Sequence, residues 1–132
     1  MKNILLILFF CGLAVVCFDA SLGYVSIAQS VGDVVTVDGF MNIAGAYGML
    51  LLSICVVLKS SCLLMGGKLP EINWNYVVYG LLLVITPSAT YITYTNIQSN
   101  IEEYVECEDA REFSLRYSSR TYAISHELCQ PQ

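Results

Sequence analysis

The order of apolar and polar positions divides this chain into three long apolar segments followed by a polar tail. The apolar segments are Ile4–Phe18, Met41–Leu58 and Trp74–Ile92, and the second and third contain no charged residue. A helix that crosses the hydrocarbon core of a bilayer needs about 20 mostly apolar residues, with a range of roughly 17–25. The pattern therefore predicts three membrane spans at about 4–27, 41–58 and 74–92, joined by loops 28–40 and 59–73.

Composition supports a membrane protein. Of the 132 residues, 56% are hydrophobic and only 13% are charged, and the mean hydropathy is +0.63. A soluble domain of this length carries far more charged surface, about a quarter of its residues. The predicted fold class is an all-α membrane protein, with a three-span domain at 1–92 and a short helical tail at 93–132.

The first segment has a second interpretation. A run of apolar residues after Lys2 is also the form of a secretory signal peptide, and Ser21-Leu22-Gly23 would be a tolerable cleavage site. Apolar character continues as far as Ile27, which favours an uncleaved first span. The sequence leaves both possibilities open.

The distribution of lysine predicts the orientation. Lys2 precedes the first span, and Lys59 and Lys68 lie between the second and third, whereas loop 28–40 has no Lys or Arg and the tail has none before Arg111. Because Lys and Arg in short loops accumulate on the cytoplasmic side, we expect the N-terminus inside the cell. Loop 28–40 and the C-terminal tail are then exported.

Two of the six cysteines, Cys107 and Cys129, lie in the predicted exported tail, where oxidation is permitted. A disulfide between them would close a loop of about 20 residues and contribute about 3 kcal/mol to stability. The alternatives are two free thiols or a bond to another chain. No C-x-x-C motif is present, so a structural bond is favoured over a catalytic one. The other cysteines are Cys11, Cys17, Cys55 and Cys62.

The second and third spans contain packing signals. Ala44 and Gly48 are four residues apart, a small-xxx-small spacing that lets helix backbones approach closely in lipid. Contact with another span of the same chain is favoured over a dimer interface. Pro87, between Thr86 and Ser88, predicts a kink in the third span, with the neighbouring hydroxyls bonding the freed backbone groups.

The exported segments are shorter and less regular. The β-branched run Val34–Val37 predicts a short strand or extended loop that packs against the tail. Ile97, Ile101, Tyr104 and Val105 recur at helical spacing, so we expect the third span to continue as an amphipathic helix. Tyr122, Ile124 and Leu128 suggest a second helical stretch around Ser118–Cys129.

Acidic residues dominate the predicted exported surface. They are spread over loop 28–40 and the run 102–109, which has no basic residue before Arg111. One interpretation is a solvated helix face, and the other is a docking surface for a basic partner, since opposed charge speeds encounter and adds specificity. The candidate partner-binding residues are Asp33, Asp38, Glu102, Glu103, Glu106, Glu108, Asp109, Arg120 and Tyr122.

The sequence shows no catalytic, cofactor or metal motif. The spans have no ionisable residue at mid-depth, which argues against an ion pathway. His126 is the only histidine, and it has no neighbours at zinc-ligand spacing. Basic patches for nucleic acid are also absent. We therefore expect a non-enzymatic protein whose partners are membrane lipid and another protein.

In size and layout the chain resembles the small inner-membrane immunity proteins of bacterial toxin systems. It is also similar to uncharacterised small enterobacterial membrane proteins with a cysteine-bearing tail. The likeness covers the whole chain in architecture and assigns no residue roles. It implies a bacterial inner-membrane protein that binds and neutralises a toxin, and the acidic run at 102–109 adds the expectation that this toxin has a basic surface. The alternative function is a small accessory or assembly subunit of a larger membrane complex.

Overall fold

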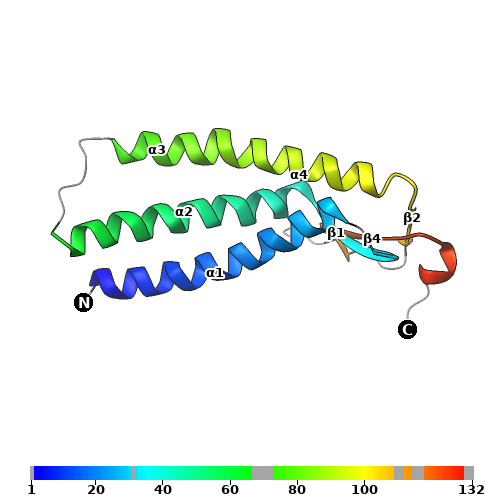
Figure 1. Ribbon diagram of the computed structural model, residues 1–132, viewed down its shortest axis with the longest axis horizontal. Helices are drawn as coiled ribbons and strands as arrows, with labels where there is room; N and C mark the ends of the chain where they lie inside the picture. The colour runs from blue at the N-terminus through cyan, green and yellow to red at the C-terminus, as the bar shows by residue number, and fades with distance from the viewer. Residues whose placement is uncertain (1, 31, 67–72, 109–111, 114–117, 130–132) are drawn as a thin grey trace.

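The computed structural model describes residues 2–30, 32–66, 73–108, 112–113 and 118–129. Three long helical segments run side by side (Figure 1). They are α1 (Lys2–Gln29), α2 (Phe40–Leu64) and a third made of α3 (Trp74–Gly80), a π-helical turn η1 (Leu81–Ile85) and α4 (Thr86–Asn100). Each is long and apolar enough to cross a membrane, which confirms the three-helix pattern. All three extend beyond the predicted spans.

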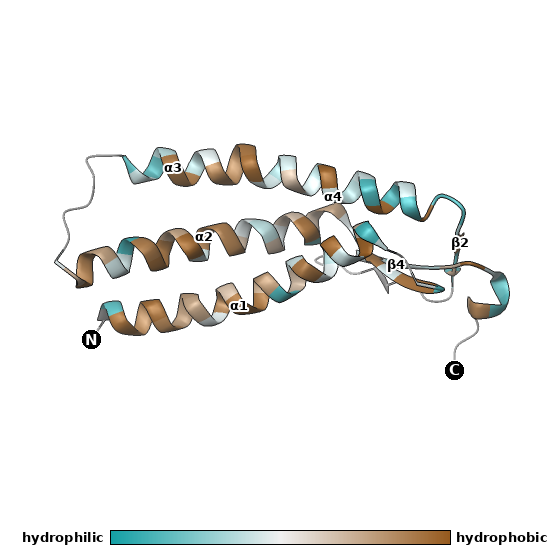
Figure 2. Ribbon diagram, in the orientation of Figure 1, coloured by the Kyte–Doolittle hydropathy of each residue, from teal (hydrophilic) through white to brown (hydrophobic). Residues whose placement is uncertain are grey.

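The apolar side chains of these helices point mostly outward. Leu5, Val15 and Leu83 are 71%, 69% and 74% exposed, and Figure 2 shows apolar residues along all three helices, with polar residues gathered toward the end of α4. In water such a surface would be unstable, whereas lipid tails solvate it without cost. The distribution of exposed residues agrees with a membrane protein.

The helices pack against one another through small and hydroxyl-bearing side chains. A built Cβ at Gly48 would lie 3.6 Å from Thr86 Cγ2 and 3.7 Å from Leu82 Cδ2, and Ala44 is half-buried one turn earlier. The buried polar side chains of the helices are Ser21, Ser53, Ser60, Thr86, Thr90 and Thr93. Several hydroxyls donate to the carbonyl four residues earlier, as Ser53 does to Met49 at 2.7 Å, so they are buried without losing hydrogen bonds.

The third helix changes geometry just before Pro87. The π-helical turn η1 ends at Ile85, and such turns are a common cause of helix distortion. The hydroxyl of Thr86 donates to the Leu81 carbonyl at 3.2 Å, and that of Ser88 donates to the Val84 carbonyl at 2.6 Å. Pro87 leaves the Leu83 carbonyl without its usual α-helical donor. The two hydroxyls bond the neighbouring carbonyls of Leu81 and Val84 and not this freed group.

The prediction of an all-α tail is wrong, because a small antiparallel sheet covers one end of the helices. β4 (Ser118–Ala123) lies at its centre and pairs with β1 (Val34–Asp38) on one edge. β2 (Val105–Glu106) and β3 (Glu112–Phe113) pair with β4 on the other. A 3₁₀ helix, η3 (His126–Cys129), follows β4. Residues 118–129 are therefore a strand and a short turn of helix, not one α-helix.

The predicted strand around Val34–Val37 is confirmed as β1, and the contact with the tail is its pairing with β4. The predicted helical continuation to Val105 is wrong beyond Asn100, because Ile101 leaves helical geometry and the chain turns into β2. The main buried core lies where the sheet meets the helix ends. It consists of Val35, Val37, Ile43, Ile97 and Ile101.

Candidate functional site

The sheet and η3 form a unit that we call the cap, which is held to the helix ends by polar contacts. The Tyr24 hydroxyl of α1 donates to Asp38 Oδ2 at 2.7 Å. At the start of α2, Asn42 Nδ2 donates to the Ser118 carbonyl at 3.2 Å, and the Gly39 backbone N–H donates to the same oxygen at 2.8 Å. These bonds join β1 and β4 to two helices, so the cap and the bundle are one packed body.

The predicted disulfide between Cys107 and Cys129 is confirmed, with a Cα–Cα distance of 5.3 Å. Cys107 follows β2 and Cys129 ends η3, so the bond ties the C-terminal turn back to the sheet. Cys107 is only 3% exposed. Because thiol exchange requires an accessible sulfur, this burial favours a structural bond. Cys11, Cys17, Cys55 and Cys62 are free thiols.

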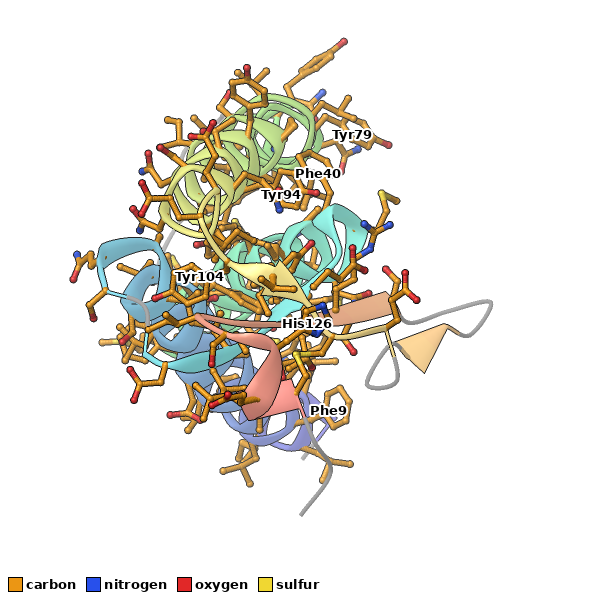
Figure 3. The ribbon with its side chains drawn as sticks, turned by 90° about the vertical axis from the view of Figure 1, so that its right-hand side faces the viewer. Phe9, Phe40, Tyr79, Tyr94, Tyr104 and His126 are labelled. Carbon is orange, nitrogen blue, oxygen red and sulfur yellow. A yellow bond between two sulfur atoms is a disulfide. The ribbon has the colours of Figure 1, made fainter. Side chains whose placement is uncertain are left out.

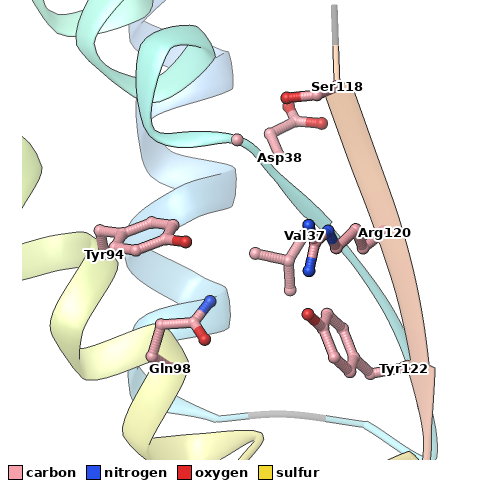
Figure 4. Close-up of a pocket in the computed structure, with 8 residues that line it drawn as sticks. Val37, Asp38, Tyr94, Gln98, Ser118, Arg120 and Tyr122 are labelled. Carbon is pink, nitrogen blue, oxygen red and sulfur yellow. The ribbon is translucent and has the colours of Figure 1, made fainter. Parts of the chain in front are cut away.

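A polar cavity of about 210 Å³ lies between the sheet and α4 (Figure 4). It is lined by Val37, Asp38, Gly39, Tyr94, Gln98, Ser118, Arg120 and Tyr122, and we call it the cap cavity. Three of the predicted partner-binding residues, Asp38, Arg120 and Tyr122, thus come together at one place. Tyr94 and Gln98 on α4 complete the wall, and sequence reasoning had not identified them as site residues.

Strand register explains how Val37, Arg120 and Tyr122 come to share the cavity. Val37 is opposite Arg120, and Val35 is opposite Tyr122; directly opposed residues project from the same face of a sheet. Arg120 Nε lies 3.8 Å from Glu106 Oε1, and these side chains are 47% and 27% exposed. A pair this open to solvent contributes little to stability. Its effect is to hold a guanidinium group at the cavity.

The acidic residues do not share one helix face. Glu102 and Glu103 are exposed on the turn after α4, Glu108 is exposed beyond Cys107, and Glu106 is half-buried in β2. Asp33 is exposed just before β1. Asp109 lies outside the described residues. The cap therefore presents carboxylates from three separate segments, spaced over its surface.

β1 is an edge strand. One of its backbone edges bonds to β4, and the other, outer edge faces away from the rest of the sheet. Backbone hydrogen bonds from Gly39 N to Ser118 O and from Ile124 N to Asp33 O show that the odd-numbered positions along this segment face β4. Bonding alternates along an antiparallel pair, so the backbone groups of Val34 and Thr36 point toward the outer edge. Both residues are exposed, and in the described part of the chain β1 pairs with β4 alone.

Among the described residues, no group of three or more His, Cys, Asp or Glu side chains is placed to hold a metal ion. The candidate site is therefore the cap with the polar cavity between its sheet and α4. Comparison with known proteins finds no family model, no curated protein and no solved structure that matches this chain. Inferences about function therefore rest on the cap and on the composition of the helices.

Proposed function

We propose that this chain is a non-enzymatic, multi-pass protein of the bacterial inner membrane whose cap binds and neutralises a toxin. The observation that supports this function is the cap itself: a disulfide-tied sheet, packed on the helix ends, that carries exposed carboxylates. Glu102, Glu103 and Glu108 are exposed on it, and the chain has a net charge of −5. Such a surface attracts a partner with a basic face.

The outer edge of β1 offers a second mode of contact on the same cap. An edge strand with outward-pointing backbone groups can pair with an extended segment of a partner. Val34 and Thr36 lie on this edge. A toxin held at the cap lies at the membrane surface, where binding blocks insertion or access to its active site.

The proposed orientation places the N-terminus in the cytoplasm and the cap outside it. Lys2 begins α1 and Lys59 lies in the last turns of α2, and these helix ends are at the opposite end of the bundle from the cap (Figure 1). A second support is the disulfide, which requires an oxidising compartment.

This orientation predicts a labelling pattern. In sealed cells, a membrane-impermeant maleimide should leave Cys62 unlabelled, because it lies near the cytoplasmic end of α2. After permeabilisation, Cys62 should react. Cys107 and Cys129 should label in sealed cells only after reduction, since they are bonded to each other. Labelling of Cys62 in sealed cells would reverse the proposed topology.

The toxin-binding function is tested by site-specific photo-cross-linking in native membranes, with the reactive residue at Thr36 or Glu108. We expect one dominant secreted or membrane-inserting toxin, captured in near-equal amount. Glu103→Lys should lower its capture at least tenfold and abolish protection of cells against it. Glu127→Lys is the matched control, because Glu127 is an exposed acid on the same cap outside the acidic run.

The alternative function, an accessory subunit of a larger membrane complex, predicts a different result. Its supporting observation is the exposed apolar surface of α1, of which Leu8 and Val16 are 65% and 67% exposed, since other membrane helices could pack there. Cross-linking from Leu8 would then capture a reproducible set of membrane subunits. That result, with no toxin captured from the cap, would contradict the immunity function.

A further inference from the structure

Directly beside the cap cavity lies a second cavity of opposite character. It is an open groove of about 490 Å³ lined by Phe40, Pro87, Ser88, Tyr91 and Ile92, and we call it the apolar groove. Four of these residues come from the first two turns of α4, and Phe40 begins α2. Tyr91 and Ile92 are 64% and 59% exposed, so the groove is open to the surroundings of the helices.

One aromatic pair separates the two cavities. The rings of Phe40 and Tyr94 meet edge to face, with centroids 5.7 Å apart, and Figure 3 shows both rings between α2 and α4 in the view onto the cap end. Phe40 lines the apolar groove and follows Gly39, which lines the cap cavity. Tyr94 lines the cap cavity about one turn after Tyr91 of the groove. The two cavities therefore adjoin across this pair.

Their depths correspond to the two layers of a lipid leaflet. The third helical segment has 27 residues, about 40 Å at ~1.5 Å per residue, whereas the hydrocarbon core is about 30 Å thick. Starting from Trp74, the core ends near Thr93. The apolar groove then lies within the hydrocarbon, and the cap cavity lies at the level of the headgroups.

The geometry points to a binding site for one phospholipid with a primary-ammonium, zwitterionic headgroup of the phosphatidylethanolamine type. Its headgroup occupies the cap cavity and one acyl chain occupies the apolar groove. The volume of about 210 Å³ is below the roughly 300 Å³ of pockets for drug-sized ligands. That volume suits a headgroup rather than a whole molecule.

Charge selects this headgroup over others. The Arg120 guanidinium is suited to a phosphate group. Asp38, which lines the same cavity at its edge and accepts a hydrogen bond from Tyr24, adds the negative charge that suits an ammonium group able to donate hydrogen bonds. A choline headgroup has no N–H to donate. An anionic headgroup such as phosphatidylglycerol would face the exposed acids of the cap and the net charge of −5. This inference depends on the helices crossing a membrane and not on the identity of the toxin.

The test is native mass spectrometry of the full-length protein, purified in mild detergent and exposed to equal amounts of phosphatidylethanolamine, phosphatidylcholine and phosphatidylglycerol. We expect one tightly held phosphatidylethanolamine, preferred at least tenfold over either competitor. Arg120→Gln should remove this preference. Ser88→Phe should fill the apolar groove and lower retention of all three lipids. Leu83→Phe is the matched control, because Leu83 is exposed on the same helix outside the groove.

A second measurement does not depend on variants. A phosphatidylethanolamine with a photoreactive acyl chain, added to the unaltered protein in nanodiscs, should label the segment that contains Tyr91. Equal retention of the three lipids, preference for phosphatidylglycerol, an unchanged preference in Arg120→Gln, or labelling spread evenly over the helices would each overturn the inference. Circular dichroism of the helices, compared with that of the unaltered protein, establishes that each variant is folded.

Discussion

Replacing Cys107 and Cys129 together by serine should destabilise the cap by about 3 kcal/mol, because the bond closes a loop with a sequence separation of 22. The helices should remain, since their hydrogen bonds lie within each segment. A loss of that size raises the open population of the cap about 100-fold. Limited trypsin digestion should then cut after Arg120 in β4 about 100-fold faster, while the circular dichroism of the helices is preserved.

The matched control for this variant is Cys11→Ser with Cys62→Ser, which also removes two sulfurs but touches no bond. It should leave the cleavage rate unchanged. If the Cys107–Cys129 double variant were cleaved no faster than the control, strand pairing and contacts to the helix ends would suffice to hold the cap. If the double variant stayed folded but lost an oxidoreductase activity, the structural role of the bond would be wrong.

The helices could be predicted from the sequence because their signal is local. Runs of apolar residues long enough to span a bilayer can form little else there, and the structure has a helix at each one. The ends were less predictable. α2 continues past Lys59 to Leu64, since a lysine near a helix end can extend its charged group to the interface and does not terminate the helix.

The sheet could not be predicted in the same way, because its pairing is not local. Thr36 and Thr121 are 85 residues apart, and their hydroxyl oxygens are 3.1 Å from each other. Nothing in the segment around Tyr122 specifies that partner. Apolar residues at Tyr122, Ile124 and Leu128 also fit helical spacing. Pairing with β1 is what makes this segment a strand and not a helix, and β1 lies in a distant part of the chain.

The candidate site was only partly predictable for the same reason. Asp38, Arg120 and Tyr122 attracted attention by residue type, and the register of β1 and β4 brings two of them to one cavity with Val37. Tyr94 and Gln98 gave no such signal. A tyrosine at the end of a span is expected from the preference of its ring for the interface, so its role as a cavity wall emerged only from the packing of α4 beside the sheet.

Replacing Gly48 by isoleucine should destabilise the helix bundle by about 1–3 kcal/mol, the usual cost of overpacking. A Cβ at Gly48 already lies in ordinary contact with Thr86 and Leu82, at 3.6 and 3.7 Å. Gly48→Ala should therefore be tolerated, whereas the further carbons of isoleucine have no room without moving the third helix. Thermal unfolding in detergent, followed by circular dichroism, measures the difference.

Gly45→Ile is the control, because Gly45 is exposed on the same helix and a Cβ there meets nothing within 4 Å. It should change stability by no more than about 0.5 kcal/mol. The loss in Gly48→Ile should not vary with protein concentration, since the contact lies within one chain. If the loss of stability instead vanished on dilution while a dimer dissociated, Gly48 would belong to an interface between two copies. The need for a glycine at this position would then not come from contact between α2 and the third helix.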